Sequence, residues 1–474
     1  MAVEWWSIIP FAILLLCIAV LPLVPAAENL WERNSVKLAV ALACGLPVAL
    51  WFIVAGHGGE VVHALVEYFQ FIMLLLALFV VAGGIFLSGN IRATPRNNTI
   101  FLAIGGLIAS FVGTTGAAML LIRPLLATNR ERTHKVHTVI FTIFIVANCG
   151  GLLTPLGDPP LFLGMLRGVP FTWTFTLWGP WLLVNALLLL TYYGLDRRAY
   201  ARENPEAIAL DTQQQQPLRL LGSGQFVLFA LVIVGVALVP SIDLAAIEAG
   251  TASTMQLLPW REILFAAITV ASIVLGNKNI RFVHNRFTWA PILEVAALFS
   301  GIFLAMMPAL NYLAQIAPSL PLNAVTLFLF SGGLSAVLDN APTYATFFEM
   351  AAQLPGDPRI GAGLGVPEAY LIAISLGAVF CGAITYIGNG PNFMVKAVAD
   401  ADGVHTPSFG GYILWALGYL VPILAAMALI FIADGTVTTM LGVAIAAALV
   451  ARALWLALRP APHNPVAAAA QQTS

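Results

Sequence analysis

Long apolar stretches separated by short polar segments run along nearly the whole chain. A helix that crosses a bilayer needs about 20 apolar residues. Plain stretches of this kind lie near 5–25, 36–55, 61–88, 171–195, 222–240, 261–276, 288–313, 410–433 and 436–458. Together with the interrupted stretches described next, they predict an all-α membrane protein with about 11 transmembrane helices.

Two further apolar stretches are interrupted by polar or helix-breaking residues. The stretch 98–128 contains Gly-Thr-Thr-Gly at 113–116, which leaves two arms that are each too short for a full crossing. The stretch 321–353 is interrupted by Asp-Asn-Ala-Pro at 339–342, where the proline removes a backbone donor. Irregular backbone at membrane depth persists only where protein or cavity water satisfies its polar groups. Both stretches are therefore predicted to be re-entrant hairpins whose tips face a cavity.

The chain also contains an internal repeat. The pattern T-x-x-G-[D/N]-x-P occurs at 154–160 and again, 231 residues later, at 385–391, each time inside an apolar stretch (136–168 and 369–400). Glutamate-bearing helices precede both copies, and the predicted number of crossings between the copies makes them inverted. Inverted repeats with discontinuous helices are typical of secondary transporters.

The repeat predicts five parts of the chain. They are an N-terminal helix (1–34), a first half (35–195), a cytoplasmic loop and linking helix (196–260), a second half (261–433), and a C-terminal helix with a disordered tail (434–474).

Composition supports a membrane protein and excludes other classes. Apolar residues make up 60% of the chain and charged residues 9%, and the formal net charge is -1. No basic block is present to neutralise phosphates, so nucleic acid is not an expected partner. The four cysteines have no paired spacing, which excludes a disulfide framework or a zinc site as the basis of the fold.

Basic residues predict the orientation. Most Lys and Arg of the loops fall on one side, whereas Arg167, Arg261 and Arg359 fall on the other. Because basic loops favour the cytoplasm, we expect an inner-membrane protein with its N-terminus outside and its C-terminus inside.

Two carboxylates lie at the polar breaks themselves, Asp158 and Asp339. An ionisable group at this depth is costly and is a functional hypothesis by default, so both are predicted to carry protons. Neutral groups near the breaks are predicted to bind an ion or substrate. They are Thr114, Thr115, Asn148, Gly150, Thr154, Gly157, Asn340, Thr385, Gly388, Asn389 and Asn392. A sodium ion is predicted at Asn148, Thr154, Asp158, Asn340, Thr385 and Asn389, with no other cofactor.

The remaining ionisable residues have simpler interpretations. Glu67 and Glu294 are expected at the membrane interface or in pairs with arginine, and Glu349 is expected to be solvated. His134 and His137 are expected at the surface, with pH sensing as the alternative.

The motifs resemble those of the ion transporter superfamily. Asn-Cys-Gly-Gly at 148–151 with Pro-Leu-Gly-Asp at 155–158 resembles a segment of NhaD-type sodium/proton antiporters, as does Asp-Asn-Ala-Pro at 339–342. The loop 385–392 departs from that pattern and is similar to the polar loop of citrate transporters. The resemblance implies two hairpins and two unwound helices in a mobile transport domain beside a scaffold, elevator-like movement, and a homodimer in the lipid bilayer.

The sequence therefore predicts a secondary transporter, and sodium/proton antiport is the favoured activity. Transport of citrate or another organic anion, or of a further ion or oxyanion, is the alternative. An intramembrane aspartyl protease is a remote one, because Gly157-Asp158 and the segment 308–310 resemble its motifs only superficially. Pro155 stands where that motif requires glycine. An enzyme is therefore not expected.

Overall fold

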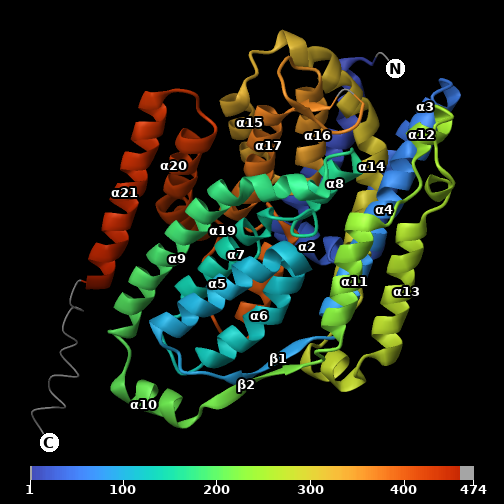
Figure 1. The fold of residues 1–474 in the computed structure, drawn as a ribbon. Helices are drawn as coiled ribbons and strands as arrows, with labels where there is room; N and C mark the ends of the chain where they lie inside the picture. Colours follow the sequence, from blue (N-terminus) through green and yellow to red (C-terminus); the bar gives the residue numbers. More distant parts are fainter. Residues whose placement is uncertain (1–2, 364, 459–474) are drawn as a thin grey trace, which may run out of the picture. The chain divides into compact units, whose positions relative to one another are not determined.

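The protein is described by a computed structural model that covers residues 3–363 and 365–458, and most of these residues are helical (Figure 1). The predicted disordered tail lies outside the described residues. The helices are α1 (Ile9–Val20), α2 (Pro25–Trp31), α3 (Asn34–Val54), α4 (Gly58–Ala82), α5 (Pro95–Val112), α6 (Thr114–Thr128), α7 (Val136–Ile145), α8 (Pro159–Leu166), α9 (Trp178–Tyr200), α10 (Pro205–Gln213), α11 (Gln225–Leu238), α12 (Leu244–Glu248), α13 (Trp260–Leu275), α14 (Ala290–Ile316), α15 (Ala324–Val337), α16 (Asn340–Ala352), α17 (Glu368–Cys381), α18 (Gly390–Ala401), α19 (Phe409–Trp415), α20 (Val421–Phe431) and α21 (Thr436–Leu458).

Six helical stretches among the described residues are long and apolar enough to cross a membrane. They are Asn34–Val54, Gly58–Ala82, Phe171–Tyr200, Ala290–Ser319, Phe409–Phe431 and Thr436–Leu458. Several other predicted spans form shorter apolar helices, among them α11 and α15. The prediction of a largely helical, multi-pass membrane protein is confirmed, while the count of about 11 crossings stays a prediction.

Short strands interrupt the helical architecture, which the sequence did not predict. Strand β1 (Phe86–Asn90) pairs with β2 (Gln216–Leu221), and β3 (Arg359–Ile360) pairs with β4 (Val366–Pro367). The predicted helix 61–88 ends at Ala82 instead. A residue far away in the sequence caps this helix end: the Asn285 side-chain amide donates to the carbonyls of Gly83 at 2.9 Å and Ile85 at 2.6 Å.

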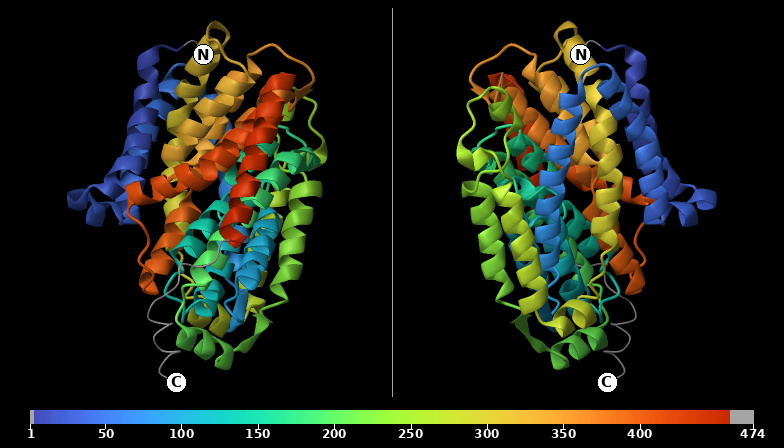
Figure 2. Two further views of the ribbon diagram at one scale, coloured as in Figure 1. Left: turned by 90° about the vertical axis from the view of Figure 1, so that its left-hand side faces the viewer. Right: turned by 90° about the vertical axis from the view of Figure 1, so that its right-hand side faces the viewer.

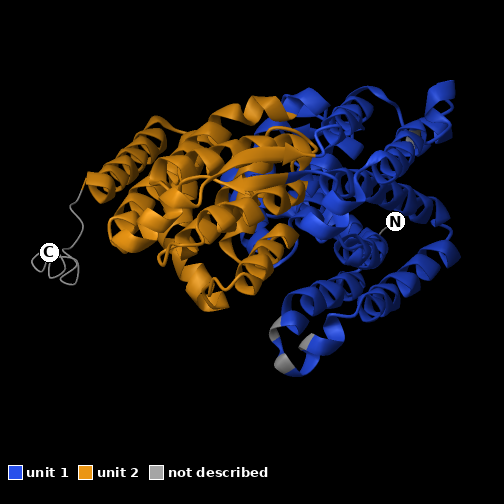
Figure 3. Ribbon diagram, turned by 90° about the horizontal axis from the view of Figure 1, so that it is seen from below, with its two compact units in different colours: residues 1–86, 159–173, 222–378 blue, residues 87–158, 174–221, 379–474 orange. Residues whose placement is uncertain are grey.

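The chain forms two compact units, each assembled from separate segments (Figure 3). Unit 1 comprises residues 1–86, 159–173 and 222–378, and unit 2 comprises 87–158, 174–221 and 379–474. Each unit combines segments from both predicted halves of the chain.

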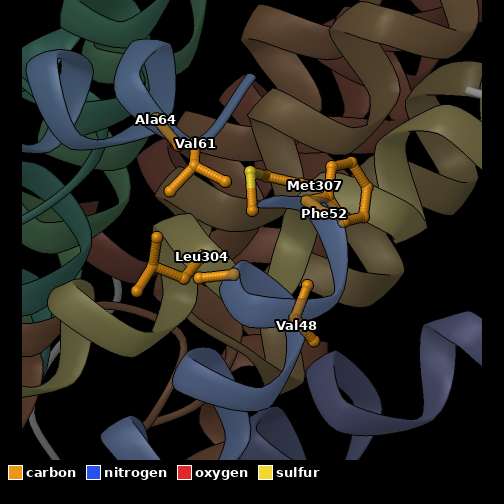
Figure 4. Packing of buried hydrophobic residues seen from close by; sticks show 7 residues of the cluster. Val48, Phe52, Val61, Ala64, Leu304 and Met307 are labelled. Atoms are coloured by element: carbon orange, nitrogen blue, oxygen red, sulfur yellow. The ribbon is translucent and has the colours of Figure 1, made fainter. Parts of the chain in front are cut away.

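Unit 1 is built around the long helices α3, α4 and α14, which can be followed in Figure 2. A Cβ on Gly301 of α14 would lie 2.2 Å from the carbonyl oxygen of Ala41 in α3, so this glycine permits direct backbone contact. Beside this contact, apolar side chains of the three helices form a buried cluster (Figure 4). It consists of Val48, Ala49, Phe52, Val61, Ala64, Leu304 and Met307.

The helix breaks lie where the sequence predicts them. Gly113, with φ of 85°, separates α5 from α6, and residues 338–339 separate α15 from α16. The segment 146–158, with the 3-10 turn η3 (Cys149–Leu152), separates α7 from α8. The segment 382–389, with the 3-10 turn η8 (Gly382–Ile384), separates α17 from α18. The helices α8 and α18 begin 231 residues apart, at the spacing of the repeated motif.

Candidate functional site

A buried carboxylate lies at the end of the first long break, in unit 2. Asp158 is 1% exposed, and its Oδ1 accepts a hydrogen bond from the Thr114 hydroxyl at 3.2 Å. The side-chain amide of Asn389 donates to the same oxygen at 3.3 Å. Thr114 is the first residue of α6 and Asn389 is the N-cap of α18. The starts of two helices therefore meet at one carboxylate, and their partial positive charge stabilises a negative group there.

Asn148 joins the two breaks of unit 2. Its amide nitrogen donates to the carbonyl of Ile143 at 2.9 Å and to Oδ1 of Asn392 at 2.6 Å. Its own Oδ1 accepts from the Asn389 amide at 3.1 Å. Because Asn148 is fully buried, all of these bonds form away from water, where an unpaired amide is costly.

The second break is stabilised from its own side by Asn392, in the first turn of α18. The Asn392 amide donates to the carbonyls of Gly382 at 2.8 Å and Thr385 at 2.9 Å. These carbonyls belong to the segment where the α17 hydrogen-bond ladder has ended, so they need another donor. Asn392 therefore supports the break while its side-chain oxygen accepts from Asn148.

Each of the two breaks contains the same kind of local turn. The amide of Leu156 donates to the Thr154 hydroxyl oxygen at 3.2 Å, and the amide of Ile387 donates to the Thr385 hydroxyl oxygen at the same distance. Each threonine thus uses its side chain to hold its own turn. Thr154 also donates to the backbone carbonyl of Ser110.

The predicted glycines allow close backbone packing. A Cβ on Gly157 would lie 2.0 Å from the Gly151 carbonyl oxygen, and a Cβ on Gly150 would lie 2.4 Å from the Gly106 carbonyl oxygen. The Gly157 carbonyl accepts from the backbone amide of Thr114 at 2.8 Å, which links the first break to the tip between α5 and α6. Gly388 precedes Asn389 in the second break, and Thr115 is half-buried in the first turn of α6.

Ser110 and the polar residues of α9 were missed by the sequence interpretation. The Ser110 hydroxyl donates to the Gly150 carbonyl at 2.5 Å and accepts from the Leu153 amide at 3.0 Å. Asn185 donates to the Cys149 carbonyl at 3.1 Å. The only sequence signal for these residues is a polar side chain within an apolar helix.

The break between α15 and α16, in unit 1, has a different chemistry. Asp339 is the N-cap of α16, and its Oδ1 accepts from the Ala341 amide at 3.1 Å. Its carbonyl accepts from the Thr343 hydroxyl at 3.0 Å. Asn340, predicted as a sodium ligand, is fully buried in the first turn of α16. The predicted ligands Asn148, Asp158 and Asn389 are thus brought together in unit 2, while Asp339 and Asn340 are described in unit 1.

Several other ionisable residues form ion pairs. Arg167 contacts Glu67 at 3.3 Å and Glu349 at 3.2 Å, so Glu67 pairs with arginine as predicted, while Glu349 is one-third exposed and also forms an ion pair. Lys37 pairs with Glu294 at 2.6 Å. The charged groups of these pairs lie at the ends of long side chains. Sequence position alone therefore does not show which of them meet.

The two histidines differ from each other. His137 is 7% exposed and lies 2.8 Å from Asp196, so the prediction of a surface position was wrong for it. Asp196 also pairs with Arg132 at 2.6 Å. His134 is exposed, as predicted.

The arrangement in unit 2 can hold a small cation. Oxygen atoms of carboxylate and amide groups are suitable ligands for hard cations, and Asp158 adds a negative charge to the neutral oxygens of Asn148 and its neighbours. The helix starts at Thr114 and Gly390 can also stabilise part of an anion.

The comparisons with known proteins agree with a transport role. A protein-family model described as "Putative citrate transport" matches residues 1–432. No curated protein matches the chain closely enough to count as a relative. This match places the chain among secondary transporters instead of enzymes. The chain belongs to this citrate transport family.

Proposed function

We propose that this protein is a secondary transporter of citrate or a related organic anion, coupled to a cation bound at Asp158. The observation that carries the proposal is the Asp158 carboxylate, held by Thr114 and Asn389 between two helix starts in a member of the citrate transport family. The carboxylate supplies the charge that a sodium ion or a proton needs. The description of the family supports the choice of anion.

The coupling follows from the competition for one group. A buried carboxylate that binds either a proton or a metal ion changes its net charge with occupancy. When Asp158 is neutralised, the nearby helix starts and amide donors are free of a competing negative charge. Anion binding at these donors is then favoured, so cation and anion bind together.

Reconstituted proteoliposomes test this function directly. We expect uptake of radiolabelled citrate that is driven by an imposed sodium or proton gradient, with the other gradient giving little uptake. Succinate and inorganic phosphate serve as competitor anions. Absence of gradient-driven citrate uptake would contradict the proposal.

Sodium/proton antiport is a second candidate function, and the chemistry of the site supports it. The Asp158 group has amide and hydroxyl partners in unit 2, and such a carboxylate can exchange a proton for sodium without any anion. In inverted vesicles with an imposed pH gradient, dissipation of the gradient by sodium or lithium in the absence of citrate would support this function over anion transport.

We also propose that the two halves are inverted repeats that support alternating access. Two observations support this proposal. Thr154 and Thr385 hold matching turns, and α8 and α18 begin 231 residues apart, which is the offset of the repeated motif. In a Cys-free background, single cysteines at Thr115 and at the partly exposed Leu338 should react with an impermeant thiol reagent from opposite sides of the membrane. Equal labelling from one side would contradict the inverted topology.

A further inference from the structure

One basic residue stands alone in the second half of the chain. Lys396 is the only Lys or Arg between Arg359 and Arg452. It lies in α18, seven residues after Asn389, which corresponds to about 10 Å along the helix axis.

The Lys396 ammonium contacts a residue of the second break. Its Nζ lies 5.6 Å from the centre of the Tyr386 ring, and Tyr386 is part of the break itself. The same ammonium pairs with Asp400, one helical turn later, so Lys396 contacts both a residue of the break and the last turns of α18.

Tyr386 is a fixed support for this ammonium. Its ring stacks on Tyr412 with centres 4.1 Å apart, and its hydroxyl donates to the Pro407 carbonyl at 3.1 Å. Tyr412 is fully buried and donates to the Ala383 carbonyl at 2.8 Å, beside the same break. The aromatic face is thus held in place before any ligand binds, and it stabilises a cation in front of it.

The present counter-ion of Lys396 has partners of its own. Asp400 Oδ2 lies 2.5 Å from Nζ, while Oδ1 accepts from the Thr406 backbone amide at 3.1 Å and hydroxyl at 2.7 Å. Asp400 therefore keeps hydrogen bonds when Lys396 leaves it. The side chains of Lys396 and Asp400 are 26% and 38% exposed, so a solute can reach the pair.

We propose that Lys396 binds a carboxylate group of the transported anion, with Tyr386 as its support and Asp400 as the group that the substrate displaces. This inference rests on the proposed function and names a specificity residue for it. The ion exchange is balanced in charge, because one carboxylate replaces another at the same ammonium. A polycarboxylate gains most from it, since the partial charges of helix starts alone offset only part of a multiple negative charge.

Citrate binding to purified protein and citrate uptake by proteoliposomes, measured together, test the inference. We expect Lys396→Gln to weaken citrate binding and to raise the KM about tenfold or more, which is the change for loss of one charged hydrogen bond. Lys396→Arg should keep most of the affinity. Asp400→Asn removes the competing carboxylate and should lower the KM. The half-saturating sodium or proton concentration measured without citrate should stay at the wild-type value in all three.

Arg452→Gln is a matched control. Arg452 lies over the Tyr419 ring at 4.8 Å in the same unit, so the variant removes a positive charge from a tyrosine face that is not part of a break. It should leave the KM for citrate unchanged.

The possible failures are distinguishable. A KM for Lys396→Gln within twofold of wild type, or a rise in KM for both Lys396→Gln and Asp400→Asn, overturns the role of Lys396 while citrate transport stands. Wild-type protein that neither binds nor transports citrate overturns the proposed function and this inference with it.

Discussion

The Asn389 amide nitrogen lies 3.3 Å from the Asp158 carboxylate, and these two residues occupy equivalent positions of the repeated motif, 231 residues apart. One copy of the motif thus supplies the charge and the other supplies a neutral donor to it. Only one of the two equivalent positions can therefore titrate. That residue, Asp158, is the target of the first prediction.

Asp158→Asn should abolish the coupling of transport to the cation while the protein still folds, because asparagine keeps the volume of the side chain. Loss of the charge should weaken cation binding by about tenfold to a hundredfold. Counterflow of citrate in proteoliposomes, with and without a sodium or proton gradient, measures the coupling. Asp434→Asn, at an exposed position just before α21, is the control and should behave as wild type. Wild-type coupling in Asp158→Asn would show that the cation binds elsewhere.

Asn148→Ala should reduce both stability and transport. It leaves the Asn389 amide and the Asn392 side-chain oxygen each without one buried partner, at a cost of about 1–3 kcal/mol in the free energy of unfolding. Thermal unfolding of the purified protein gives the stability and citrate uptake gives the activity. Asn279→Ala, at an exposed position, is the control. An unchanged melting temperature for Asn148→Ala would mean that the two breaks do not depend on this amide.

Gly157→Ala should disrupt the first break, whereas Gly390→Ala should be tolerated. A Cβ on Gly157 would lie 2.0 Å from a backbone carbonyl oxygen, but a Cβ on Gly390 would have no neighbour within 4 Å among the described atoms. Overpacking of this kind costs about 1–3 kcal/mol or more. Expression level, melting temperature and transport should fall for Gly157→Ala alone. Equal effects of the two variants would argue against the backbone contact.

Arg167→Gln should destabilise unit 1, because it leaves the carboxylates of Glu67 and Glu349 without their shared cation. Arg167 is nearly buried, whereas both glutamates are about one-third exposed, so we expect a loss of about 1–3 kcal/mol instead of the larger cost of a fully buried charge. Adding Glu67→Gln and Glu349→Gln to this variant should restore part of the melting temperature. If the triple variant is less stable than Arg167→Gln, the charge explanation is wrong.

Asp211→Asn should stabilise the protein in a pH-dependent way. Asp211 lies in α10, outside the predicted spans, and its Oδ2 accepts from the Ala93 amide at 3.1 Å. Burial raises the pKa of this carboxyl above its ordinary value of 3.8. The folded protein then binds its proton more tightly than the unfolded chain, so stability falls as the pH rises above that ordinary value. Asparagine does not titrate and can still accept from Ala93.

The melting temperature of Asp211→Asn should therefore exceed that of wild type at pH 7.5, and the difference should shrink toward pH 4. Glu206→Gln, at an exposed position on the same helix, is the control. A difference that does not change with pH would mean that the proton of Asp211 is not involved.

The sequence by itself determined the class of the protein and the places of the four breaks within its apolar stretches. The length of apolar stretches reflects the thickness of the bilayer, and Gly113 and Asp339 mark helix breaks through local backbone geometry, while Pro342 lies in the first turn of α16. The break at Gly113 and the starts of α8 and α18 could therefore be predicted without knowledge of any distant contact.

Only the tertiary structure decided which polar groups meet. Asn148 and Asn392, 244 residues apart, are hydrogen-bonded, while the predicted ligand Thr154 donates to Ser110 instead. The contact between Lys396 and Tyr386 also had no local signal. A buried polar group must find a partner, but sequence shows only that it needs one. The identity of the partner depends on which backbones approach closely, and side-chain packing over the whole unit decides that approach.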